Sequence, residues 1–131
     1  MKTRLRRAVS ACVALAAGSL ILFAFGHRTR AYASDADERA RGAIAFHTKG
    51  CERCHSITGV GGDRAPDLSS VGLHRSGRQI KEQIVQGGHG MPPFEHVLTK
   101  DEVKDLAAFL ASCRSATAPG CRDWTGPPPA Q

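Results

Sequence analysis

Apolar residues recur along this chain with the spacing of short amphipathic helices, which are separated by polar loops. After one continuous apolar run near the start, apolar positions recur every three or four residues in three windows, residues 35–50, 76–86 and 99–112. This period places an apolar stripe on one face of a helix. No stretch shows the β-branched alternation that a sizeable sheet requires. The pattern therefore predicts an all-α domain of three to four short helices.

The first predicted helix begins at Ser34 or Asp35, either of which is able to cap it, and ends at Gly50. Its stripe comprises Ala40, Ala43, Ile44 and His47, with Gly42 and Phe46 beside it. His47 is interpreted as a partly exposed residue of the last turn, where a cation suits the helix dipole.

The other two helices carry capping signals. Ser76 and Gln79 begin one helix, whose stripe is Ile80, Ile84 and Val85 and which ends at Gly87-Gly88. Thr99 and Glu102 begin the other, whose stripe is Val103, Leu106, Ala107 and Leu110. On its flank, we expect Phe109 to meet Gly42 and Phe46, because a glycine lets two helices approach closely.

The first apolar run, Ala8 to Phe25, has the features of a secretory leader. A basic head precedes it, and the small residues of Ala31-Tyr32-Ala33 follow it as a cleavage signal. This predicts a signal peptide over residues 1–33. Arg28 and Arg30 leave an uncleaved membrane anchor open as a second interpretation. Both interpretations export the domain that follows.

The net positive charge of the chain comes from the predicted leader. The 131 residues contain 18 Lys and Arg against 12 Asp and Glu, but six of the basic residues and none of the acidic ones precede Ser34. The exported part is therefore neutral overall. Its charge gives no support to nucleic-acid binding.

The main candidate for chemistry is Cys51-Glu52-Arg53-Cys54-His55, a CxxCH motif. Two thiols at this spacing attach to the two vinyl groups of a haem, and the adjacent imidazole reaches the iron. A zinc site would need a second ligand pair, which Cys12, Cys113 and Cys121 do not form. A thioredoxin-like pair would need a sheet, and a plain Cys51–Cys54 disulfide would leave His55 without a role.

A second candidate ligand lies in the loop after the 76–86 window. Met91 follows Gly90 and precedes Pro92 and Pro93, and a residue before proline is biased away from helical geometry. A thioether at such a fixed place is a candidate iron ligand. His89 and His96 lie nearby in sequence and leave a bis-histidine iron open.

The segment after Cys113 is rich in alanine, proline and glycine and ends in three prolines. Residues 114–131 are therefore predicted to be a flexible tail. Cys113 and Cys121 are candidates for a disulfide in an oxidising compartment, and Trp124 is expected either to pack on the domain or to contact a partner.

From Asp35 to Cys113 these residues resemble the class I c-type cytochromes, which are small monohaem electron carriers of bacterial periplasms. The resemblance consists of the first helix, CxxCH, the Ala65-Pro66-Asp67-Leu68 loop, Met91 before proline, and the last helix with Phe109. It implies the cytochrome c fold, all-α helices and irregular loops around one covalent haem c, over residues 34–113.

The resemblance also implies roles for individual residues. Cys51 and Cys54 would attach the haem, and His55 and Met91 would be the two iron ligands. Pro66 would accept a hydrogen bond from the His55 ring, and Leu68 would pack on the haem.

An iron with both axial positions filled favours electron transfer over oxygen chemistry. We therefore predict a periplasmic carrier, not an enzyme, that works as a monomer and docks transiently with redox proteins. The surroundings of the predicted site, residues 47–91, carry a small basic excess that fits an acidic partner. Two alternatives remain open: a haem subunit or sensor whose Met91 ligand is displaceable, and a thiol or metal module without haem.

Overall fold

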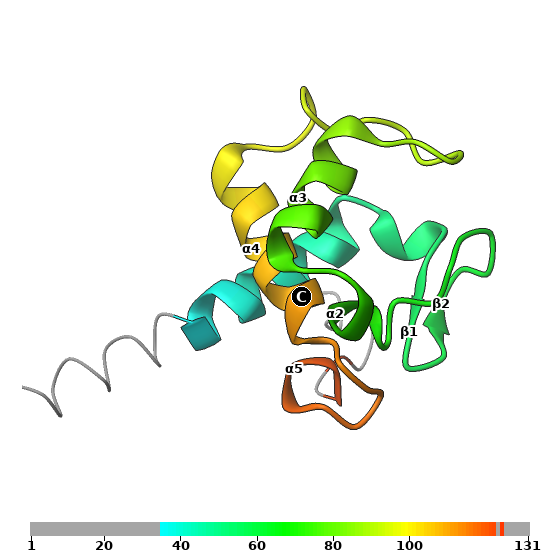
Figure 1. Ribbon diagram of the computed structural model, residues 1–131, viewed down its shortest axis with the longest axis vertical. Coiled ribbons are helices and arrows are strands. Elements are labelled where there is room, and N and C mark those ends of the chain that lie inside the picture. Colours follow the sequence, from blue (N-terminus) through cyan, green and yellow to red (C-terminus); the bar gives the residue numbers. More distant parts are fainter. Residues whose placement is uncertain (1–34, 123, 125–131) are drawn as a thin grey trace, which may run out of the picture. The chain divides into compact units, whose positions relative to one another are not determined.

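The structure, a computed structural model, describes residues 35–122 and Trp124. These residues form a mostly helical domain with long loops, as the resemblance implies (Figure 1). In chain order the elements are a helix over residues 35–48, η1 (Cys51–Arg53), β1 (Ser56–Ile57), β2 (Val60–Gly61), α2 (Val71–His74), α3 (Gly77–Gln86), α4 (Lys100–Ser112) and α5 (Pro119–Arg122). None of the helices in this part of the chain is long and apolar enough to cross a membrane. The predicted leader lies outside the described residues.

The helix over residues 35–48 crosses α4 with almost no space between the two backbones. A Cβ atom added to Gly42 would lie 2.1 Å from the Asp105 carbonyl oxygen and 2.7 Å from Phe109 Cβ. Beside this contact the rings of Phe46 and Phe109 meet edge to face, with centroids 6.1 Å apart. The predicted meeting of Gly42, Phe46 and Phe109 is therefore confirmed.

The buried face of this first helix differs from the predicted stripe. Gly42, Ala45 and Phe46 are buried, whereas Ile44 is 54% exposed and Ala40 is also exposed. The close contact at Gly42 determines which face turns inward, and a glycine contributes nothing to a hydrophobic pattern. The predicted stripe was therefore wrong.

Three ion pairs join this first helix and the turn after it to α4. They are Arg41–Asp105 (2.7 Å), Lys104–Glu38 (2.7 Å) and Lys49–Glu102 (2.8 Å). The Asp105 carboxylate is buried and accepts two hydrogen bonds from the Arg41 guanidinium. A buried carboxylate needs such pairing, so Arg41 fixes the position of the first helix on α4.

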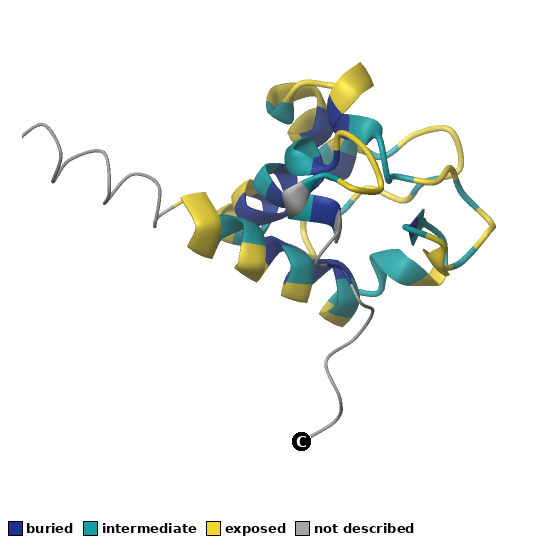
Figure 2. Ribbon diagram, turned by 90° about the horizontal axis from the view of Figure 1, so that it is seen from below, coloured by how far each residue is buried: buried dark blue, intermediate teal, exposed yellow. Residues whose placement is uncertain are grey.

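Both predicted capping boxes are present. In α3 the Ser76 hydroxyl accepts from the Gln79 N–H while the Gln79 side chain accepts from the Ser76 N–H, and Thr99 and Glu102 do the same in α4. From α3, Ile80 and Ile84 enter the core, as predicted. Figure 2 shows that the buried residues lie along the helices, whereas the loops are mostly intermediate or exposed.

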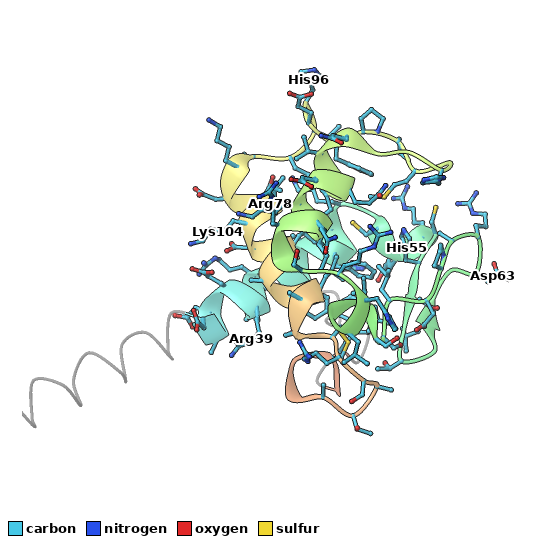
Figure 3. All side chains as sticks on the ribbon, in the orientation of Figure 1. Arg39, His55, Asp63, Arg78, His96 and Lys104 are labelled. Atoms are coloured by element: carbon cyan, nitrogen blue, oxygen red, sulfur yellow. A yellow bond between two sulfur atoms is a disulfide. The ribbon has the colours of Figure 1, made fainter. Side chains whose placement is uncertain are left out.

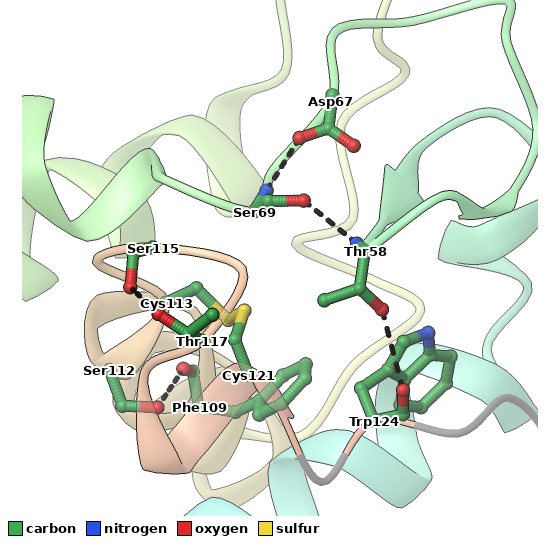
Figure 4. The surroundings of a disulfide bond; sticks show 10 residues. All are labelled: Thr58, Asp67, Ser69, Phe109, Ser112, Cys113, Ser115, Thr117, Cys121 and Trp124. Carbon is green, nitrogen blue, oxygen red and sulfur yellow. Dashed lines mark hydrogen bonds between the residues drawn. A yellow bond between two sulfur atoms is a disulfide. The ribbon is translucent and has the colours of Figure 1, made fainter.

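In the part of the segment after Cys113 that the structure describes, residues 114–122 and Trp124, the chain is ordered against the domain. Cys113 and Cys121 form a disulfide, α5 follows the turn between them, and Trp124 is buried (Figure 4). The indole packs on Phe46 and Phe109, with ring centroids 5.3 and 5.9 Å away. The core therefore extends beyond residue 113, and the packing interpretation of Trp124 is confirmed.

The loop after CxxCH contains a small hairpin that the pattern did not predict. Strands β1 and β2 have only two residues each and pair in antiparallel register, with Ser56 opposite Gly61 and Ile57 opposite Val60. Thr58 and Gly59 make the turn with φ of 53° and 80°, the positive values that two-residue hairpin turns require. Strands this short leave no alternation to detect.

Candidate haem site

The CxxCH segment begins where the first helix ends. Gly50 has a left-handed φ of 76°, and η1 starts at the next residue. The amide N–H groups of Cys54 and His55 both donate to the Cys51 carbonyl, at 3.2 and 3.0 Å. The two cysteines form no disulfide with each other, and both are half-buried. This tight turn keeps the two sulfur-bearing residues and His55 together on one short segment.

The His55 ring is held by a loop eleven residues further along the chain. Its Nδ1 lies 2.8 Å from the Pro66 carbonyl oxygen. A carbonyl only accepts hydrogen bonds, so Nδ1 donates in this contact and Nε2 is the ring nitrogen left for another partner. An imidazole oriented in this way by a backbone carbonyl is typical of a histidine that binds a metal.

Burial acts on the Cys51 thiol. It raises the pKa of Cys51 to about 11, with smaller contributions from Cys54 and Glu52. Redox-active CxxC pairs have a lowered pKa, and burial shifts the pKa of Cys51 in the opposite direction.

Met91 lies in a tight turn between α3 and α4. Gly88 and Met91 exchange two backbone hydrogen bonds, 2.8 and 3.0 Å long. His89 and Gly90 occupy the turn with φ of 53° and 88°, as in a type I′ turn. Just before it, a Cβ on Gly87 would lie 2.6 Å from the Met91 carbonyl oxygen. The backbone of Met91 is thus fixed by its neighbours.

The predicted site residues fit a haem in both chemistry and polarity. Cys51, Leu68 and Met91 are partly buried and pack against the same hydrophobic core. Val71, Val85 and Phe94 share this position at the edge of the core. A large apolar cofactor needs such a surface, together with the imidazole nitrogen and the soft sulfur that iron binds in cytochromes.

The two other candidate histidines differ in placement from His55. His89 is exposed at the tip of the turn that precedes Met91. His96 is exposed too, and Figure 3 shows it at the far end of the loop before α4, well away from His55.

A set of polar residues beside His55 is not identified by the sequence analysis, which names Asp67 only as part of the loop that contains Pro66. The Asp67 carboxylate accepts hydrogen bonds from the Ser56 hydroxyl (2.8 Å) and from the Ser69 N–H (2.9 Å). The second contact is an Asx turn, for which an Asp followed two residues later by a free N–H is the typical signal.

Comparison with known proteins identifies the family. Residues 37–110, more than half of the chain, match the family model described as cytochrome c oxidase, cbb3-type, subunit III. The chain belongs to this cytochrome family. The cytochrome therefore carries one covalently bound haem c, and its general function is haem-based electron transfer.

Curated relatives of the cytochrome include three bacterial proteins. It is 33% identical over 70 residues to cytochrome c-555 of Methylococcus capsulatus, 32% over 83 residues to the cytochrome bc1 complex cytochrome c subunit of Corynebacterium efficiens, and 30% over 81 residues to a nitric oxide reductase subunit of Stutzerimonas stutzeri. These matches cover 53%, 62% and 53% of this chain, and 57%, 28% and 54% of the relatives. The cytochrome thus corresponds to only part of each relative.

A solved structure supports the fold. The crystal structure of the c-type cytochrome SorU from Sinorhizobium meliloti aligns with a TM-score of 0.52 and 21% sequence identity, over 60% of this chain and 93% of that one. The predicted cytochrome c fold is confirmed.

Proposed function

We propose that this protein is an exported carrier of single electrons, with the haem attached through Cys51 and Cys54 and the iron bound by His55 and Met91. The observation that carries the proposal is the 2.8 Å contact between His55 Nδ1 and the Pro66 carbonyl within an intact CxxCH segment. It leaves one ring nitrogen free, at the place where the motif requires a ligand. In this proposal Leu68, two residues after Pro66, supplies apolar contact to the haem.

The second axial ligand decides between carrier and catalyst. A bound haem supplies a one-electron couple, and axial ligation by His and Met raises its reduction potential and leaves no open iron position. The hydrogen-bonded turn at Gly88 and Met91 holds the backbone of Met91 in place, which favours a permanent ligand. We therefore assign no enzymatic activity to the domain by itself.

The chain is proposed to work in the periplasm, exported by residues 1–33 and cleaved before Ser34. Two of its relatives are named as a subunit of a cytochrome bc1 complex and a subunit of a nitric oxide reductase, and this supports redox proteins as partners. We propose brief docking of a monomer, because redox encounters usually bury small interfaces. N-terminal sequencing of the exported protein is expected to begin at Ser34, and an intact Met1 on membrane-bound material would establish the anchor instead.

Replacement of the sulfur ligand tests the proposal. In Met91→Ala we expect the weak sulfur-to-iron absorption band in the near infrared to disappear and the reduction potential to fall. His89→Ala, in the same turn, is the matched control and is expected to keep the band. An unchanged spectrum in Met91→Ala, with the band lost in His89→Ala, would assign the ligand to His89.

Carbon monoxide provides a test of the displaceable-ligand alternative. The reduced protein is expected to keep its Soret band when carbon monoxide is added, because both axial positions are filled. A rapid shift would contradict the carrier function and support a sensor or an open catalytic site. Mass spectrometry under denaturing conditions is expected to show the haem attached, and bare protein would exclude the covalent site.

A further inference from the structure

Two segments of the site run side by side, and hydrogen bonds join them at a nearly constant sequence separation. Residues 54–58 begin at the second cysteine of the motif, and residues 65–69 form the loop that contains Pro66. Two backbone bonds connect them, Ala65 N–H to the Cys54 carbonyl (3.0 Å) and Leu68 N–H to the Ser56 carbonyl (2.8 Å). The His55–Pro66 contact lies between these two.

Two side-chain contacts complete this ladder. The Ser56 hydroxyl donates to Asp67 Oδ2 at 2.8 Å, and the Thr58 N–H donates to the Ser69 hydroxyl oxygen at 2.8 Å. Both pairs are eleven residues apart, the same separation as His55 and Pro66. Figure 4 shows that Asp67, Ser69 and Thr58 form one continuous chain of hydrogen bonds.

The Asp67 carboxylate uses both of its oxygens. Oδ2 accepts from Ser56, and Oδ1 accepts from the Ser69 N–H at 2.9 Å. Partial burial acts to raise the pKa of Asp67, but the hydrogen bonds from Ser69 and Ser56 outweigh it and hold this pKa below its usual value. Asp67 is therefore ionised at neutral pH and is fixed from two sides.

The two backbone bonds are made by the N–H groups of Ala65 and Leu68, on either side of the carbonyl that His55 contacts. The Pro66 carbonyl itself belongs to the planar peptide group between residues 66 and 67. Rotation of this peptide would swing the oxygen away from Nδ1. The side chain of Asp67, tied to Ser56 next to His55, opposes this rotation at one end of the peptide.

Resting on the proposed function, we infer that Asp67 and Ser56 are positioning residues for the axial ligand: they hold the Pro66 carbonyl on His55 and thereby tune the reduction potential. A firmly held acceptor on Nδ1–H makes the imidazole a stronger donor to iron. Stronger donation stabilises the oxidised state. Loss of the Ser56–Asp67 contact therefore raises the potential.

The test uses the mature, haem-loaded protein and two readouts. The first is the solvent exchange rate of the His55 Nδ1 proton, followed by NMR in the reduced, diamagnetic state, and the second is the reduction potential. Ser56→Ala and Asp67→Ala are expected to speed the exchange roughly fivefold or more, which corresponds to the loss of one hydrogen bond, and to raise the potential.

Two further variants separate geometry from charge and from general polarity. Asp67→Asn removes the charge but keeps groups able to form hydrogen bonds with Ser56 and Ser69. The exchange rate of the His55 Nδ1 proton in this variant is therefore expected to stay close to that of the wild type. Ser115→Ala makes the same chemical change as Ser56→Ala at an exposed hydroxyl whose hydrogen-bond partner is Thr117. It is expected to alter neither readout.

The outcomes that overturn the inference differ from those that overturn the proposed function. Wild-type exchange and potential in Ser56→Ala, in a protein with attached haem and an intact His55 signal, would refute positioning and leave the carrier function untouched. Equal potential shifts in Asp67→Asn and Asp67→Ala, without faster exchange, would reduce Asp67 to a charge effect and also refute it. If Asp67→Ala does not fold, the exchange rate and the reduction potential of Ser56→Ala alone test the inference. Absence of attached haem in wild type would instead refute the proposed function.

Discussion

The helix crossing and the loops at the proposed haem site are held by different interactions. At the crossing, buried aromatic rings and three ion pairs join segments that are far apart in the sequence. A disulfide between Cys113 and Cys121 adds a local link in the segment that leads to Trp124. At the site, hydrogen bonds and tight turns join segments about a dozen residues apart or fewer, and much of this surface is exposed.

This difference separates stability from function. Burial of large apolar side chains contributes most to folding, so the crossing supplies most of the free energy of unfolding. The loops contribute less to stability, and they contain the predicted ligands. Substitutions in the loops are therefore expected to change the iron environment at little cost in stability, and substitutions at the crossing to do the reverse.

The largest effect is expected for Gly42→Ala. The added methyl group would lie 2.1 Å from a backbone oxygen of α4, and the rigid helix pair has no room to yield. We expect a loss of about 3 kcal/mol or more in the free energy of unfolding, measured by denaturant titration. Gly90→Ala is the control, because a Cβ there has no neighbour within 4 Å and only the positive φ opposes it. Its expected cost is about 1 kcal/mol. Similar losses in the two variants would contradict the role of close packing.

Removal of the disulfide is expected to have the next largest effect. Cys113 and Cys121 close a loop with a sequence separation of 8, and chain entropy predicts a stabilisation of about 2.5 kcal/mol for a loop of this size. The double variant Cys113→Ala/Cys121→Ala should lose that amount in chemical unfolding while its visible spectrum and potential stay unchanged. A shifted potential would show that the crossing and the site are coupled.

The charge of Glu102 is expected to stabilise the protein in a way that depends on pH. Hydrogen bonds from Lys49 and Thr99 lower the pKa of Glu102 below its usual value. A group whose pKa is lowered on folding stabilises the protein above its unfolded pKa, about 4.3, and this contribution is lost as the pH falls through the lower folded value. Glu102→Gln, which keeps the capping box, should therefore have a lower free energy of unfolding than wild type at pH 7 and the same value at low pH. A difference in this free energy that persists at low pH would contradict the prediction.

The smallest effect is expected for Ile44→Gln. Ile44 is 54% exposed, so its replacement should change the free energy of unfolding by less than about 0.5 kcal/mol. Ala45→Gln, one position along and buried, is the matched comparison and should cost more than about 1 kcal/mol. A larger loss for Ile44→Gln than for Ala45→Gln would show that Ile44 lies on the buried face, as the sequence pattern predicts.

The parts of the fold that the sequence predicted are those encoded locally. The capping boxes at Ser76 and Thr99 need only four adjacent residues, and CxxCH needs five. The contact of Gly42 with Phe109 was predicted because a glycine beside aromatic residues is itself a signal for close helix packing. In each case a few residues contain the whole geometric requirement.

The parts that were missed depend on tertiary contacts. Composition alone predicts a flexible segment after Cys113 and leaves the packing of Trp124 as one of two alternatives, whereas in the structure Trp124 packs on Phe46. Ile44 has the right period for burial, but the close contact at Gly42 turns another face inward. The role of Asp67 depends on Ser56 lying beside it, and the sequence alone does not show that pairing.

The position of Trp124 in the core has a consequence for biogenesis. A chain emerges from the ribosome with its N-terminal part first. Phe46 and the adjacent CxxCH segment are therefore synthesised long before the indole that completes their aromatic cluster. This cluster is incomplete until residue 124 has been added.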